Sequence, residues 1–350
     1  PTPLSSAVPA RLRPTPTSTI CASASATVFT ATVIHHYPRL VRKVRAAIPG
    51  CPQNLELTGR ARDEGSHLSR RCIVEPGIVL DELNRQLKPH GLWFPVDVST
   101  SSRATIGGMT ANNSCGGRSI RYGIMRDNVL SIDAILADGS HASFGAYDPA
   151  AAKPAGRLGE ILSDLLALGK THGDEILSSF PKVLRRVGGY NIDSLIPDAM
   201  ALRPDGKSGD GINLAHLLVG SEGTLAYSTA ITLKLSLLPA RKVMALCHFP
   251  TFYKAMDTAQ HLVTLDPVAV ELIDSTMLDL ARSISIFRPT VETYIKGKPA
   301  AILVVEFAEE DPAENTRRLA ALKTMMADLG FGWDKPAALT GGTVVLTEDD

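Results

Sequence analysis

A glycine-rich stretch between Phe94 and Leu130 is the feature of this sequence that most constrains its fold. It contains the pairs Gly107-Gly108 and Gly116-Gly117 among many Ser, Thr and Asn residues, and it lacks the apolar periodicity of a helix or a strand. Ordering such a segment is expensive, because glycine loses more conformational entropy on folding than any other residue. Either a ligand compensates for that cost, or the segment is a surface loop without a ligand.

A phosphate-bearing cofactor suits this segment chemically. Glycines let the backbone approach closely, successive N–H groups form an anion-binding concavity, and small hydroxyl side chains donate to phosphate and ribose. Two common nucleotide fingerprints are missing, because no G-x-G-x-x-G follows a strand and opens a helix, and no G-x-x-x-x-G-K-[ST] occurs. We therefore expect neither a Rossmann dinucleotide site nor a P-loop.

The pattern along the chain divides it into three segments. Residues 1–70 are rich in Pro, Ser, Thr, Ala and Arg, and only Tyr37–Ala47 is expected to form a short helix there. Strands and helices follow over 71–238, and a second α+β unit over 239–350 is still adding elements where the sequence stops. The abrupt change at Arg71 suggests a frame-shifted or mis-started product before it, and we expect the last segment to be an incomplete domain.

Hydrophobic periodicity and turn residues predict the individual elements. The expected strands are Cys72–Glu75, Leu130–Ala137, Ser140–Phe144, Ala226–Leu235, Val243–Phe249, Val268–Leu272, Ala301–Phe307 and one beginning at Val344–Leu346. The expected helices are Val79–Leu87, Ile161–Gly169, Phe252–Val263, Leu278–Ala281 and Pro312–Leu329.

Composition excludes several classes of function. Lys plus Arg equals Asp plus Glu at 36 each, and aromatic residues make up 5%, so we expect no nucleic-acid partner. No run approaches the roughly 20 apolar residues of a transmembrane helix, which predicts a cytoplasmic protein and leaves peripheral membrane attachment open. The cysteines show no metal-ligand spacing, so we expect no metal site and read them as thiols of a reducing compartment; they are Cys21, Cys51, Cys72, Cys115 and Cys247.

Several strings occur together in a characteristic order. They are Val74-Glu-Pro-Gly77, Ser99-Thr-Ser-Ser-Arg-Ala-Thr-Ile-Gly-Gly108, Asn113-Ser-Cys-Gly116, Arg121-Tyr-Gly123, Asp127-Asn128 and Gly220-Ser-Glu-Gly-Thr-Leu225. In order and spacing they resemble the FAD domain of the vanillyl-alcohol-oxidase-like flavoproteins. Two further strings, Phe180-Pro-Lys-Val-Leu-Arg-Arg-Val-Gly-Gly-Tyr-Asn-Ile-Asp193 and Phe287-Arg-Pro-Thr-Val-Glu292, are similar to the FAD-linked D-lactate and D-2-hydroxyglutarate dehydrogenases, especially the long forms with an iron–sulfur domain.

The resemblance implies a fold and a cofactor. The fold is α+β, with a PCMH-type FAD-binding domain of two α+β lobes over 71–238 and a partial, ferredoxin-like α+β cap domain over 239–350. The cofactor is FAD. The cofactor-binding residues implied are Ser101, Ala104, Thr105, Ile106, Gly107 and Gly108 at the pyrophosphate and ribose, Asn113, Ser114, Gly116, Tyr122 and Gly123 beside the flavin, and Gly220, Glu222, Gly223 and Thr224 from the second lobe.

Structural alternatives stay open for these residues. The glycines could permit turns, Asn113 and Ser114 could satisfy loop backbone, Tyr122 could be a core aromatic, and Glu222 could cap a helix. We expect structural roles for Tyr190 and Asn191, although the resemblance places them near the flavin, and also for His216 and His248.

The resemblance also implies a reaction. A D-2-hydroxy acid gives hydride from its Cα to the flavin, and the electrons pass to a quinone, a cytochrome, an electron-transfer flavoprotein or an iron–sulfur domain. No catalytic residue is assigned, because similar proteins carry the substrate-binding Arg, Lys and His residues in a part of the cap that we expect to be absent here. Their Arg-Gly-Gly-Gly-Thr-Ser phosphate loop also has no counterpart in residues 1–70.

Two other functions remain open on the sequence. One is a sugar-acid or aldonolactone oxidase, which shares the FAD domain but differs in the cap. The other is a non-catalytic FAD-domain fragment that serves as a binding or structural module.

Overall fold

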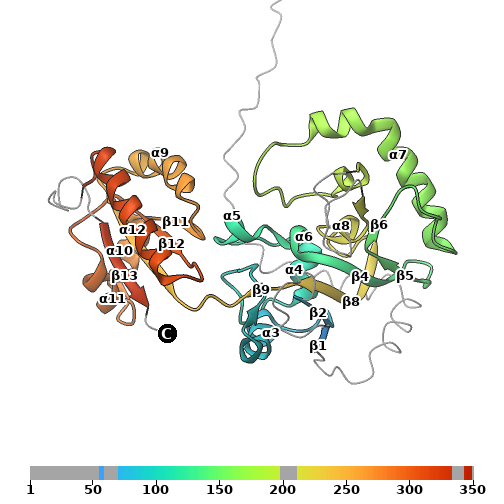
Figure 1. The fold of residues 1–350 in the computed structure, drawn as a ribbon, viewed down its shortest axis with the longest axis horizontal. Helices are drawn as coiled ribbons and strands as arrows, with labels where there is room; N and C mark the ends of the chain where they lie inside the picture. The colour runs from blue at the N-terminus through green and yellow to red at the C-terminus, as the bar shows by residue number, and fades with distance from the viewer. Residues whose placement is uncertain (1–54, 59–69, 198–210, 333–342, 349–350) are drawn as a thin grey trace, which may run out of the picture.

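A computed structural model describes residues 55–58, 70–197, 211–332 and 343–348, and it contains two main sheets in separate domains (Figure 1). The chain passes from the first domain to the second once, between the end of the strand β9 and the start of β10. No helix among these described residues is long and apolar enough to cross a bilayer.

The first domain is organised around a five-stranded sheet in which every neighbouring pair is antiparallel. The order is β1 (Leu55–Thr58), β2 (Arg71–Val74), β8 (Ala226–Lys234), β4 (Val129–Leu136) and β5 (His141–Phe144). Ile132 on β4 lies opposite Ile231 on β8, and both side chains are fully buried. Burial of apolar side chains such as these against the surrounding helices is the main term that stabilises the domain.

Short elements surround this sheet. The helices are α3 (Leu80–Leu87), α4 (Ile106–Asn112), α5 (Ser119–Tyr122), α6 (Met125–Asn128), α7 (Arg157–Ser179) and α8 (Ala215–Leu218), with 3₁₀ turns η1 (Lys88–His90) and η2 (Ile192–Leu195). Two-residue strands pair as β3 (Leu92–Trp93) with β9 (Ser236–Leu237) and as β6 (Ala146–Tyr147) with β7 (Ile212–Asn213).

The second domain has a four-stranded antiparallel sheet in the order β11 (Ala269–Asp274), β12 (Ala301–Phe307), β10 (Lys242–Phe249), β13 (Thr343–Glu348). Its helices are α9 (Phe252–Leu262), α10 (Ser275–Ser283), α11 (Arg288–Tyr294) and α12 (Pro312–Asp328), and η3 (Val263–Leu265) follows α9. Numbered by their order along the chain, the neighbouring strands across this sheet are the second, third, first and fourth. This is the strand order of a ferredoxin-like sheet. The α10–α11 pair is inserted between its second and third strands.

Alternation along the strands explains why helices cover both faces of the second sheet. On β10, Cys247 and Phe249 belong to the larger core with α9 and α12, whereas Leu246 faces the other way and packs with Leu278 of α10. Side-chain caps fix where these helices begin. Asp274 accepts a hydrogen bond from the Met277 N–H at 2.9 Å at the start of α10.

The α+β fold expected from the sequence is confirmed, and so are most elements. The predicted strand Ala301–Phe307 has the same bounds in the structure, and the helix predicted over Val79–Leu87 is α3, with Leu80, Leu83 and Leu87 buried on one face. The turn after it ends at Gly91, whose φ of 67° favours glycine. The helix predicted over Tyr37–Ala47 lies outside the described residues.

Two expectations were wrong. Helix α7 runs over Arg157–Ser179, whereas the sequence predicted only Ile161–Gly169. The prediction was too short because few positions of the helix are buried and the apolar pattern at its ends is weak. The glycine-rich segment contains α4, α5 and α6, which are at most seven residues long and too short to show a period. In the poorly patterned segment 1–70, for which the sequence predicted no strand, the structure describes β1, which pairs with β2.

Candidate cofactor site

Two motifs that lie more than 100 residues apart in the sequence meet in the structure. The C-terminal end of α4 contacts the turn Gly220–Gly223, where the Gly220 N–H donates to the Thr110 carbonyl at 3.0 Å and the Glu222 N–H donates to the Ala111 carbonyl at 2.9 Å. The Asn112 amide also donates to the Glu222 carboxylate at 3.0 Å. The structure therefore brings together two segments that the resemblance places beside the cofactor.

Asn113 holds this junction together. It is fully buried with a left-handed φ of 54°, its Oδ1 accepts from the Arg126 N–H at 3.0 Å, and its Nδ2 donates to the Arg186 carbonyl at 3.5 Å. Gly220 packs against it, and a Cβ there would lie 3.2 Å from the Asn113 Cβ, in addition to the strain of a φ of 82°. The open alternative, in which Asn113 satisfies loop backbone, agrees with these contacts.

The turn after Gly220 contacts Tyr190 through the side chain of Thr224. The Thr224 hydroxyl donates to the Ser221 carbonyl at 2.6 Å, so it accepts from the Tyr190 hydroxyl, 2.8 Å away. Glu222 has a left-handed φ of 52° and lies in the turn, so the suggestion that it caps a helix is wrong. Ser114, on the other side of the junction, donates through its hydroxyl to the Asn112 amide oxygen at 3.3 Å.

Asn191 contacts the segment that leads into Gly220, and His216 is part of that segment. Asn191 is fully buried, and its Nδ2 donates to the carbonyls of Val219 at 2.8 Å and His216 at 3.2 Å. Burial, reinforced by the positive charge of Arg126, lowers the pKa of His216 to about 4. His216 is therefore neutral at pH 7, and these contacts agree with the structural roles expected for both residues.

The segment Ser101–Gly108 contradicts part of the sequence-based reasoning. Its backbone N–H groups were expected to bind phosphate, but four of them already donate to protein acceptors within 3.2 Å: Ala104 to Thr100, Ile106 to Ile78, Gly107 to Pro76 and Gly108 to Thr105 Oγ1. The expectation of an anion-binding concavity is wrong for these four groups. The Ser101 N–H likewise donates to the Val98 carbonyl at 3.2 Å.

Packing explains why residue 107 is glycine. A Cβ on Gly107 would lie 2.5 Å from the Pro76 Cβ and 2.9 Å from its carbonyl oxygen. The glycine therefore lets α4 begin directly against the Val74-Glu-Pro-Gly77 turn. The two motifs occur together in the sequence because their backbones touch in the fold.

Gly116, Tyr122 and Gly123 form a separate group on the side of the second domain. A Cβ on Gly116 would overlap the carbonyl and carboxylate of Asp97, and Gly123 has a φ of 77°. The Tyr122 ring packs edge-on against Trp93 with centroids 5.4 Å apart, and burial raises the pKa of its hydroxyl. Tyr122 thus has the contacts of the core aromatic that the sequence left as an alternative.

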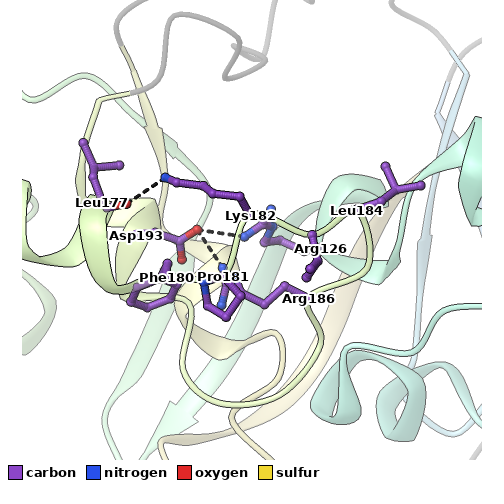
Figure 2. A pocket seen from close by; sticks show the side chains of 9 residues that line it. Arg126, Leu177, Phe180, Pro181, Lys182, Leu184, Arg186 and Asp193 are labelled. Carbon is purple, nitrogen blue, oxygen red and sulfur yellow. Dashed lines mark hydrogen bonds and ion pairs between the residues drawn. The ribbon is translucent and has the colours of Figure 1, made fainter.

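Sequence reasoning missed a basic pocket beside Asn113 (Figure 2). Its volume is about 250 Å³, and its lining includes Arg126, Lys182, Arg186 and Asp193, with Phe180 and Leu184 among the apolar residues. The signal was present, because Lys182, Arg185 and Arg186 follow one another closely in the Phe180–Asp193 string. What could not be read was that Arg126, 60 residues earlier, would join them.

The junction fits a flavin in two respects. The Asn191 Oδ1 is buried without a hydrogen-bond partner among the described residues, so it is an acceptor that a polar ligand could satisfy. A Cβ on Gly189 or Gly223 would meet nothing within 4 Å, so the backbone on this side is open to a ligand. A flavin offers polar ring edges and a hydroxylated chain to such a surface.

Comparisons with known proteins agree with this geometry. Residues 60–145 match the FAD binding domain family, and residues 238–338 match the C-terminal domain of FAD linked oxidases. The chain therefore contains an FAD binding domain and the C-terminal domain of an FAD linked oxidase, and these two domains indicate FAD as its cofactor.

Particular relatives narrow the likeness. The chain is 32% identical over 264 residues to a D-2-hydroxyglutarate dehydrogenase of Pseudomonas putida. The aligned region covers 73% of this chain and 25% of that protein. It is 30% identical to the D-2-hydroxyglutarate dehydrogenase of Escherichia coli, over 73% of this chain and 25% of that protein. A probable mitochondrial D-lactate dehydrogenase of Danio rerio is 32% identical over 59% of this chain and 31% of its own length. The chain thus spans about a quarter to a third of the length of these relatives.

Proposed function

We propose that this chain is the flavin-binding part of an FAD-dependent dehydrogenase that oxidises a D-2-hydroxy acid. The observation that carries the proposal is the identity of 30–32% to two D-2-hydroxyglutarate dehydrogenases over 73% of the chain. D-2-hydroxyglutarate and D-lactate are the two substrates that the names of the relatives support. The electrons leave for an acceptor other than oxygen, of the quinone, cytochrome, flavoprotein or iron–sulfur type.

We place the flavin at the junction between α4 and the Gly220–Thr224 turn. Bound FAD would supply the hydride-accepting chemistry. In this proposal Asn113 and Ser114 form one wall, Gly220, Glu222, Gly223 and Thr224 form the other, and the Tyr190 hydroxyl holds the Thr224 side chain in place. Ser101 and Thr105, rather than the occupied N–H groups of Ala104, Ile106, Gly107 and Gly108, would offer donors through their hydroxyls.

The reaction itself is tested on the flavin spectrum. The purified chain, loaded with FAD, is mixed without oxygen with D-2-hydroxyglutarate or D-lactate, and the absorbance at about 450 nm is followed, since hydride transfer removes that band. We expect one D-acid to bleach the flavin and its L-enantiomer to leave it unchanged. A bound flavin that neither acid bleaches would overturn the dehydrogenase proposal for this chain.

The position of the flavin is tested with a matched pair of glycine substitutions. Gly223 and Gly91 both have a positive φ, 71° and 67°, and neither has a neighbouring atom within 4 Å of a Cβ position. Alanine at either site therefore has room for its Cβ and meets backbone strain of about 1 kcal/mol or more. If FAD passes over Gly223, Gly223→Ala lowers FAD occupancy and Gly91→Ala, at the left-handed turn after α3, does not. Equal occupancy in both variants would contradict the placement.

A further inference from the structure

The basic pocket beside Asn113 carries an excess of positive charge that the neighbouring carboxylates only partly offset. Three of its lining side chains are cationic, Arg126, Lys182 and Arg186, and one is anionic, Asp193. Both arginines donate to the same oxygen, Asp193 Oδ2, at 3.1 Å and 2.6 Å. Three cations against one carboxylate give the lining a net charge of about +2. The Arg126 Nε also lies 3.7 Å from Asp127 Oδ1, outside the lining, so the cluster that includes Asp127 keeps a net charge of about +1.

Each cation also keeps hydrogen-bond donors beyond its contacts with the protein. A guanidinium has five N–H donors and an ammonium has three. Lys182 directs one of its donors to the Leu177 carbonyl at 2.7 Å, and each arginine uses one for Asp193. The remaining donors are of the kind that bind carboxylate and phosphate oxygens, and the planar guanidinium does so with two parallel bonds.

The arginines are held in place before any ligand arrives. The guanidinium of Arg186 lies over the Phe180 ring with its carbon 4.4 Å from the centroid, and its side chain is 13% exposed. The backbones of Arg126 and Arg186 are both hydrogen-bonded to the Asn113 side chain. Side chains that are already ordered lose less entropy on binding, which favours affinity.

Size limits the ligand. Pockets for drug-sized ligands and cofactors usually measure about 300–1,000 Å³, and this pocket measures about 250 Å³. It accommodates a single oxyanion group or a small acid, and not a whole dinucleotide.

We propose that the pocket formed by Arg126, Lys182 and Arg186 binds a small oxyanion, a carboxylate or a phosphate group, next to the flavin junction. The inference rests on the geometry of these side chains and not on the substrate proposed above. Two alternative sources can supply this oxyanion. One is a free small acid or phosphate in solution, and the other is a phosphate group of FAD itself.

The experiment measures the affinity of inorganic phosphate for the full chain by calorimetry at low ionic strength, with and without added FAD. The main variant is Lys182→Gln, because Lys182 is exposed and bonds only to a carbonyl in the described structure, so its loss spares the Arg126–Asp193–Arg186 contacts. Removing one charge-assisted contact should weaken phosphate binding about tenfold. Arg186→Lys, which keeps the charge but loses the fork, should weaken it as well.

The control is Lys170→Gln, which removes an exposed cation from α7, the helix that precedes Lys182 and ends at the pocket. We expect this variant to bind phosphate as the parent does. Phosphate binding to the FAD-loaded chain identifies a free anion as the ligand, whereas phosphate that binds only without FAD and competes with it identifies a cofactor phosphate. Absence of saturable binding in both states, or equal weakening by Lys170→Gln and Lys182→Gln, overturns the proposal. A chain that fails to bind FAD still tests the site in its FAD-free state.

Discussion

Replacing Glu306 by Gln should loosen the contact between the two domains. Glu306 lies in the central strand β12 of the second sheet and accepts two hydrogen bonds from Arg118 of the first domain, at 2.9 Å and 3.2 Å. The side chains are 10% and 23% exposed, so water screens the pair only weakly. Arg118 also lies over the Trp93 ring, 5.5 Å from its centroid.

The expected cost follows from this burial. Removing one partner of a buried ion pair costs about 3–5 kcal/mol, because the other charge stays buried without compensation. The partial exposure of Arg118, and the single neutral hydrogen bond that Gln can still accept, reduce the expected cost here to about 2 kcal/mol. That corresponds to a factor of about 30 in the equilibrium between docked and undocked domains.

Trp93 fluorescence reports this contact. The chain has two tryptophans, so the measurement uses a Trp333→Phe background in which Trp93 is the only one. We expect Glu306→Gln to shift Trp93 emission to longer wavelength and to lower the free energy of urea unfolding by about 2 kcal/mol. The control is Glu160→Gln, whose ion pair with Arg157 is 68% and 53% exposed and should contribute below about 0.5 kcal/mol. Unchanged emission together with a loss no larger than that of the control would refute the reasoning.

Two further predictions concern packing and pH. Gly107→Ala should lower the melting temperature, because its Cβ would lie 2.5 Å from the Pro76 Cβ and overpacking costs about 1–3 kcal/mol, whereas Gly188→Ala, with open space at its Cβ, should not. The folded state holds His216 at a pKa of about 4, below its ordinary value, so it takes up a proton less readily than the unfolded state. Stability from this group is complete above pH of about 6.5 and is lost as the pH falls toward 4, by up to about 3 kcal/mol. His216→Gln should therefore flatten the pH dependence of unfolding between those values, and parallel curves for the two proteins would contradict the assignment.

Local pattern was sufficient for much of the fold. The alternation of Ala301–Phe307 and the leucine stripe of α3 predicted these elements with bounds close to those of the structure, because the period of buried positions is set by strand and helix geometry. The cofactor class also followed from sequence, since the order and spacing of several short strings carried the resemblance that the domain matches at 60–145 and 238–338 support.

Roles of single residues could not be read in the same way. Glu306 interrupts an apolar strand, and nothing in its neighbourhood along the chain indicates that Arg118, 188 residues away, neutralises it. The glycine-rich segment had the composition of a phosphate loop, but whether an N–H group is available depends on what lies opposite it. Pro76 and Ile78 occupy two of those groups in the fold.

The sequence by itself determined most of the longer strands and helices, the α+β class and the flavin motifs, because each strand, helix or motif depends on residues close together in the chain. Only the tertiary structure decided that α4 meets the Gly220–Gly223 turn and that Arg126 joins Lys182 and Arg186 around one pocket. The physical reason is that these arrangements depend on long-range packing and on the competition of each polar group for partners, neither of which is encoded in local periodicity.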